Sequence, residues 1–221
     1  MKYLFTEEQF ITLLVLAGQK NMYMFRQKED LSETAIVRSV AELYRRKQVV
    51  PCEGRMVLSG EIMELVGTMS RSPYAVMVTF AEEDFRQQLI YPGSGGKAAV
   101  MEKQTGFGSP VIKLWSIRAE DYIQDLFEEQ RFPGSLTARR EEAMALERRA
   151  LKELPEGYGP EDVCLEIRRL GDPVTDRRIE AFRSPLFTWI RIHTGDQDCY
   201  HVYSTEEIAG LLLSEIKGEE I

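Results

Sequence analysis

Two histidines, His193 and His201, flank a short segment that also contains Asp196, Asp198 and Cys199. Imidazole, carboxylate and thiolate groups are the ligands that zinc prefers in proteins. The spacing matches no closed zinc motif, and Asp-rich turns are common between strands. We therefore expect an exposed hairpin with two incidental histidines and no metal site.

Nucleophilic catalysis would have to use the same segment, because the chain has only two histidines. A nucleophile needs a neighbouring base, and Cys199 lies two residues from His201, on the same face of a predicted strand. The sequence contains no nucleophile elbow and no obvious oxyanion loop. The acidic run Glu82-Glu83-Asp84 precedes apolar residues, which favours a cap or a solvated turn over an acid–base pair. We expect no catalytic residues, no cofactor and a protein that is not an enzyme.

The glycine-rich segment 93–97 (GSGGK) is similar in composition to a phosphate-binding loop. Such a loop must join a strand to a helix, so that the amides of the helix meet the phosphates. Here Lys97 is followed by Ala98-Ala99-Val100, which predicts a strand. We therefore do not expect nucleotide binding.

The turns at 93–97 and 104–110 are better candidates for recognising another protein. Aromatic residues beside flexible turns bury a large area at low entropic cost. The predicted partner-binding residues are Tyr91, Lys97, Gln104 and Phe107. For Tyr91 and Trp115 the alternative is a place in the core of the sheet, which we favour for Trp115.

A second interpretation assigns DNA binding to the N-terminal part. Ile36, Val40, Leu43 and Tyr44 recur at helical spacing, which predicts one apolar helix face followed by a hairpin. This order is typical of a winged helix-turn-helix. The cations that would contact DNA phosphates are Arg38, Arg45, Arg46, Lys47 and Arg55.

The charge of the chain limits this alternative to its N-terminal part. The 221 residues carry a formal net charge of −8. Residues 1–60 hold 9 Lys and Arg against 7 Asp and Glu, a net of +2, and the remainder holds 19 against 29, a net of −10. The predicted helix also carries Glu33 and Glu42 and has few side chains that would read base edges. Nucleic acid is therefore expected only through the N-terminal part.

Composition and targeting signals indicate a globular cytoplasmic protein. Hydrophobic residues make up 43% of the chain and charged residues 29%. Two glutamates precede the first apolar stretch, which is not the pattern of a signal peptide. No apolar run approaches the roughly 18 residues of a membrane span, so we expect no membrane partner. The three cysteines are widely spaced, which favours reduced thiols.

The order of predicted elements indicates an α+β fold of antiparallel β-meanders with packed helices. Thr6, Ser32, Ser59 and Ser204 are the predicted N-caps of four helices. The segments 115–122 and 203–208 both read as strand, cap, acidic pair and apolar helix, which suggests two similar halves. The predicted segments are 1–80, a winged-helix-like helical segment with a hairpin and a strand; 81–135, a first β-meander plus a helix; 136–160, a charged helix and linker; and 161–221, a second β-meander plus a C-terminal helix.

This order resembles that of the EspG-type accessory proteins of ESX (type VII) secretion. The residues that carry the resemblance are Arg55-Met56-Val57-Leu58 with the following helix, the turn Phe132-Pro133-Gly134, and the stretch from Phe187 to Ile216. These positions are structural. The resemblance implies a cytosolic chaperone that holds helical secretion substrates, and hence a helical protein partner.

Overall fold

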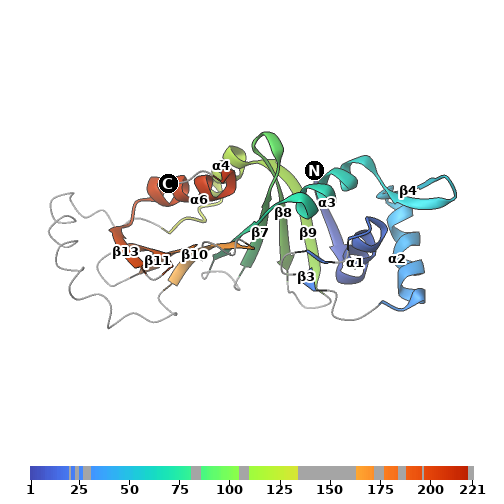
Figure 1. Cartoon of the computed structure of the whole chain (residues 1–221), viewed down its shortest axis with the longest axis horizontal. Helices are drawn as coiled ribbons and strands as arrows, with labels where there is room; N and C mark the ends of the chain where they lie inside the picture. Colours follow the sequence, from blue (N-terminus) through green and yellow to red (C-terminus); the bar gives the residue numbers. More distant parts are fainter. Residues whose placement is uncertain are drawn as a thin grey trace. The chain divides into compact units, whose positions relative to one another are not determined.

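The computed structural model confirms the α+β class (Figure 1). It divides into two compact units: unit 1 comprises Met1–Ala75 and Gln88–Arg118, and unit 2 comprises Val76–Gln87 and Ala119–Ile221. The residues that the structure describes are 1–19, 21–22, 25–26, 31–80, 86–104, 110–133, 163–171, 177–183, 188–195 and 197–218. The helix and linker predicted at 136–160 lie outside them.

The sheet of unit 1 is built from an N-terminal strand and a three-stranded meander. Its order is β1-β9-β8-β7, and neighbouring strands run antiparallel. The strands are β1 (Lys2–Thr6), β7 (Arg86–Pro92), β8 (Lys97–Gln104) and β9 (Val111–Arg118), with the short helix η1 (Ser94–Gly96) between β7 and β8. The meander confirms the predicted strands, whereas β1 was not anticipated from the sequence.

Helices α1 (Glu7–Leu16) and α3 (Gly60–Arg71) pack on one face of this sheet. Side chains alternate along a strand, and Phe5, Ile112 and Leu114, which lie on the helix-covered face, are fully buried. Lys103 on the same face pairs with Glu7 of α1. This packing leaves the other face of β1 and β9 pointing away from α1 and α3.

The rest of unit 1 contains helix α2 (Glu33–Arg45) and two short hairpins. Helix α2 packs on α1 and leads into the hairpin of β4 (Val49–Cys52) and β5 (Arg55–Leu58), as predicted. The two-residue turn has positive φ at Glu53 (49°) and Gly54 (78°), the geometry that matches the twist of a tight hairpin. Figure 1 shows the hairpin projecting beyond the end of α2. A second pair, β2 (Asn21–Met22) and β3 (Phe25–Arg26), is only two residues long on each side.

All four predicted N-cap residues begin their helices, and three of them form a side-chain cap hydrogen bond. The hydroxyl of Thr6 accepts a hydrogen bond from the Gln9 amide while the Gln9 side chain accepts one from the Thr6 amide, which completes a capping box. Ser32 and Ser204 also accept hydrogen bonds from backbone amides of their helices. Ser59 also occupies the N-cap position of α3, as predicted, but its side chain forms no cap hydrogen bond.

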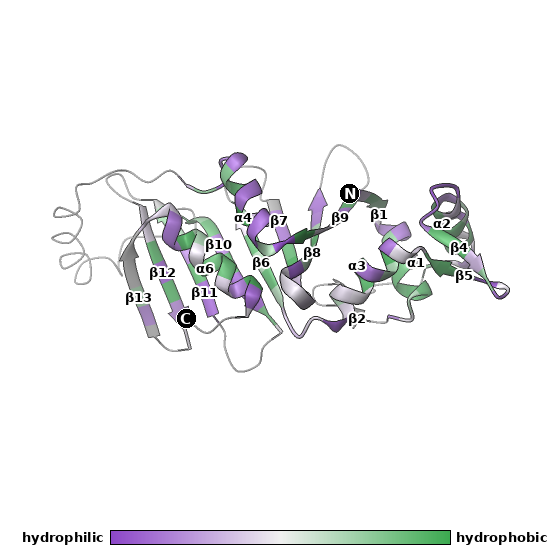
Figure 2. Cartoon of the chain, turned by 90° about the horizontal axis from the view of Figure 1, so that it is seen from above, coloured by the Kyte–Doolittle hydropathy of each residue, from purple (hydrophilic) through white to green (hydrophobic). Residues whose placement is uncertain are grey.

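Unit 2 holds the second meander and two helices. Its strands follow the order β6-β10-β11-β12-β13, and α4 packs against α6. Figure 2 shows α6 over strands whose bands alternate between hydrophobic and hydrophilic residues. The elements are β6 (Ala75–Phe80), α4 (Ala119–Glu128), β10 (Val163–Leu170), β11 (Arg177–Arg183), β12 (Thr188–Thr194), β13 (Gln197–Val202) and α6 (Thr205–Lys217).

An ion cluster fastens α6 to this sheet. Glu215 on α6 is only 2% exposed. It accepts a 2.8 Å hydrogen bond from Nε of Arg169 on β10, and Nη1 of Arg177 on β11 lies 3.1 Å from its second oxygen. A buried carboxylate is tolerated when it is paired in this way. The cluster therefore fixes the position of α6 over β10 and β11.

Candidate functional site

Helix α2 has an inner side that packs and an outer side that does not. Ala35, Ser39 and Leu43 are buried. At about 100° per residue, Val37, Ala41 and Tyr44 share one outer stripe, and Arg38 and Arg45 lie beside it. All five are exposed, with exposed fractions of 64% for Val37 and 53% for Tyr44. We call these five residues the α2 outer face.

The α2 outer face is unoccupied by the described part of the chain. None of its five side chains forms a hydrogen bond or an ion pair with a described residue. The sequence had placed Tyr44 on the inner apolar face, and its exposure corrects that prediction. A stripe of Val, Ala and Tyr on the outside of a helix is unusual, because the outer side of a surface helix is ordinarily charged or polar.

The charges next to this face are positive. Arg45, Arg46 and Lys47 at the end of α2 are exposed, as is Arg55 on the hairpin that follows α2. The acidic residue of the same stretch, Glu42, is half-buried and accepts a 2.6 Å hydrogen bond from the side chain of Gln9. Between residues 38 and 47, every exposed charge is therefore a cation.

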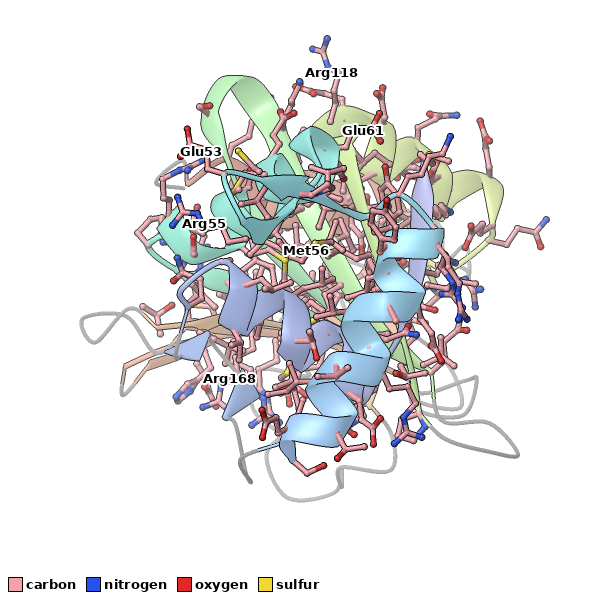
Figure 3. The ribbon with its side chains drawn as sticks, turned by 90° about the vertical axis from the view of Figure 1, so that its right-hand side faces the viewer. Glu53, Arg55, Met56, Glu61, Arg118 and Arg168 are labelled. Atoms are coloured by element: carbon pink, nitrogen blue, oxygen red, sulfur yellow. The ribbon has the colours of Figure 1, made fainter. Side chains whose placement is uncertain are left out.

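Two acidic side chains mark the ends of this surface. Glu33 is exposed at the beginning of α2, and Glu53 is exposed at the tip of the hairpin. Figure 3 shows Glu53 near Arg55. The five cations predicted to contact DNA are thus all exposed, but Arg46 also donates a 3.3 Å hydrogen bond to the carbonyl of Leu4 on β1. That contact joins the end of α2 to the edge of the sheet.

The predicted partner-binding residues near the glycine-rich turns have different surroundings, and Lys97 and Gln104 lie at opposite ends of β8. Tyr91 is fully buried, and burial raises its pKa above the ordinary value, so its ring belongs to the core and its prediction as a contact residue is wrong. Lys97 is exposed and lies 3.7 Å from Glu64 of α3. Gln104 donates a hydrogen bond to buried Glu102. Phe107 lies outside the described residues.

The histidine segment forms a hairpin edge. Nδ1 of His193 lies 2.6 Å from Oδ1 of Asp198, and both side chains are more than a third exposed. The register pairs Cys199 with Ile192, so Cys199 and His193 lie on opposite faces of the sheet. Within the residues that the structure describes, no group of three or more His, Cys, Asp or Glu side chains could hold a metal.

Sequence reasoning missed Val37 and Ala41 as candidate contact residues. The signal was present, because 37, 41 and 44 are spaced for one side of a helix. It was overlooked because Ile36, Val40 and Leu43 form a second and more apolar series in the same helix.

No protein-family model matches the chain, and no curated protein matches it significantly. None of the helices in the described ranges has the length and apolar character needed to cross a membrane.

Proposed function

We propose that this protein is a non-enzymatic protein-binding factor whose α2 outer face binds an acidic amphipathic helix of a partner protein. The observation that supports this function is the exposed stripe of Val37, Ala41 and Tyr44 flanked by Arg38 and Arg45. Covering a Val or Tyr side chain of this exposure is worth about 1–2 kcal/mol each.

The positive flanks define the chemistry of the partner. A helix that covers Val37 and Tyr44 with its own apolar face places its flanking positions beside Arg38 and Arg45. Acidic residues at those positions are attracted by the two cations and strengthen binding, whereas basic residues are repelled and weaken it. The resemblance to EspG-type proteins suggests that the partner is a helical secretion substrate held by this chain as a chaperone in the cytoplasm.

A winged-helix DNA-binding regulator is the second candidate. The exposure of Arg38, Arg45, Arg46, Lys47 and Arg55 favours it, because all five guanidinium or ammonium groups lie where phosphate could reach them. The apolar stripe opposes it, because the outer face of a recognition helix reads base edges through polar side chains. Arg38 and Arg45 at its edges could contact guanine, but the stripe between them is Val37, Ala41 and Tyr44, with no Asn, Gln or Ser.

Two fluorescent amphipathic peptides with one apolar face test the proposal. One carries Glu and the other Lys at the flanking positions, and binding to the full chain is followed by fluorescence anisotropy. The acidic peptide is expected to bind, more weakly as salt is added, and the basic peptide is not. Val37→Asp should weaken binding at least tenfold, because it places a carboxylate in the stripe and beside the acidic flank.

A matched control replaces an exposed apolar residue elsewhere in unit 1. Val15→Asp alters a residue that is 43% exposed on α1 and should leave binding unchanged. Equal binding of both peptides, or equal loss with Val15→Asp and Val37→Asp, overturns the proposal. In host cells, a photoreactive residue at position 41 should crosslink a protein with an acidic helix. Crosslinks to nucleic acid alone would instead support the regulator.

A further inference from the structure

A second cluster in unit 1 lies on the sheet face that α1 and α3 leave uncovered. The register pairs Lys2 with Trp115 and Leu4 with Lys113, so these four side chains lie on one face of β1 and β9. Tyr3 and Phe5 point to the opposite face, where the Tyr3 hydroxyl meets Glu61 of α3. The cluster of Lys2, Leu4, Lys113 and Trp115 is therefore separate from the α2 outer face.

Two ammonium groups gather around one indole ring. Nζ of Lys2 lies 5.2 Å and Nζ of Lys113 lies 5.3 Å from the Trp115 ring centroid. Cation–π attraction accounts for the contact of each lysine with the ring. The two cations nevertheless repel each other, because each lies within 5.3 Å of the same ring centroid and like charges repel. Neither lysine forms an ion pair with a carboxylate in the described part of the chain.

The N–H group of the indole has no acceptor among the described residues. Trp115 is 5% exposed, and its Nε1 is buried. Buried N–H groups are ordinarily paired, and each exception calls for an explanation. Beside the ring, Leu4 is 52% exposed and offers an apolar contact.

One carboxylate faces the same cluster. Glu102 lies directly across from Lys113 on β8 and is 3% exposed. Its two oxygens accept 2.6 Å hydrogen bonds from the side chains of Gln88 and Gln104. Glu102 therefore lowers the positive potential of the cluster without neutralising it, and Lys2 and Lys113 leave one net positive charge.

We propose that Lys2, Lys113 and Trp115 form a binding site for an oxyanion, the phosphoryl or carboxylate group of a ligand whose apolar part covers Leu4. An oxyanion near both ammonium groups offsets their mutual repulsion and forms charge-assisted hydrogen bonds with them. Such a group lies beside the Trp115 ring that both lysines contact, so the indole resonance reports its binding. The site goes beyond the proposed protein-binding function and involves none of the residues of the α2 outer face.

The chain contains only two tryptophans, which makes the site directly observable. The indole ¹⁵N–¹H resonances of the wild-type full chain are followed while sodium phosphate or sodium acetate replaces sodium chloride at constant ionic strength and pH. Trp189→Phe assigns the two signals. We expect a saturable shift of the Trp115 signal and a constant Trp189 signal. Phosphate saturating first indicates a phosphoryl ligand, and acetate saturating first indicates a carboxylate ligand.

Three variants separate the site from general charge effects. Lys2→Gln and Lys113→Gln should each lower the affinity for the anion several-fold. Glu102→Gln should raise this affinity, because it removes the opposing charge. Lys103→Gln on the helix-covered face is the matched control and should change nothing. The proposal is overturned if neither anion gives a saturable shift, or if the shift persists in the Lys2→Gln, Lys113→Gln double variant.

Discussion

Glu215 attaches α6 to the sheet of unit 2 through two arginines. Replacing it with Ala leaves Arg169 and Arg177, both less than a fifth exposed, without their carboxylate. Breaking a buried pair by removing one partner costs about 3–5 kcal/mol. We therefore expect Glu215→Ala to lower the free energy of unfolding by an amount in that range. The measurement is urea denaturation followed by the fluorescence of Trp189, in a Trp115→Phe background.

Glu120→Ala is the matched control for this prediction. Glu120 also pairs with an α6 residue, Lys217 at 2.9 Å, but its side chain is 45% exposed. Solvent-exposed pairs contribute about 0–1 kcal/mol. Equal destabilisation by the two substitutions would show that the burial of Glu215 contributes nothing to the stability of α6.

The hydroxyl of Tyr3 should lose its proton at a higher pH than an ordinary tyrosine. Its hydrogen bond to Glu61, together with partial burial and the negative charge of Glu61, raises its pKa from 10.0 to about 12. The folded state therefore keeps a proton that the unfolded state loses, so this contribution to stability is complete below pH 10 and is lost as the pH rises towards 12. The difference in phenolate absorbance between wild type and Tyr3→Phe should rise near pH 12.

A second variant tests the cause of this shift. Glu61→Ala removes both the hydrogen bond and the negative charge. In this background, the rise in phenolate absorbance that depends on Tyr3 should therefore move towards pH 10. A step that stays near pH 12 in Glu61→Ala would assign the raised pKa to burial alone.

Aromatic residues show where single positions escape sequence reasoning. Tyr91 is in the core and Tyr44 is exposed, the reverse of the assignment made from their neighbours. Glycine-rich turns flank Tyr91, but the strand pairing that buries it involves Ala99 on β8. Tyr44 follows Leu43 at the border of an apolar series, and helical spacing alone leaves the side of a border residue undecided.

At the scale of elements, the capping box of α1 should contribute measurably to stability. Thr6→Ala removes the hydroxyl that accepts from Gln9, and loss of an N-cap costs about 1 kcal/mol. Ser59→Ala is the matched control, since Ser59 has no side-chain cap hydrogen bond, and surface substitutions of that kind stay within about 0.5 kcal/mol. Urea denaturation of both variants should therefore show a lower midpoint for Thr6→Ala only. Equal midpoints would contradict the role of the box.

Most helices and strands could be predicted because the sequence patterns that determine them are local. Caps, helical spacing and the Gly54 turn lie within a few residues of what they determine. Strand β1 had no such signal, since its partner β9 begins more than a hundred residues later and the strand is five residues long. The oxyanion cluster depends on that pairing, so the sequence could not bring Lys2 and Trp115 together.

At the scale of the whole molecule, the distribution of charge separates the two candidate functions. The chain carries −8, yet the exposed charges from Arg38 to Lys47 are all positive. A local cationic surface on an acidic molecule attracts an acidic protein segment at short range. A long DNA duplex also responds to the net charge of the whole chain, which is negative and disfavours its approach.

We therefore expect no retention of random-sequence double-stranded DNA at about 0.15 M salt, near physiological ionic strength. Gel-shift titrations over a salt series provide the measurement, with the acidic peptide as the positive control in the same buffers. Arg45→Ala combined with Arg46→Ala should weaken binding of the acidic peptide and leave the migration of the DNA unchanged. A DNA complex that persists at this salt concentration and is lost in the double variant would favour the regulator, because Arg45 and Arg46 would then be contacting phosphates.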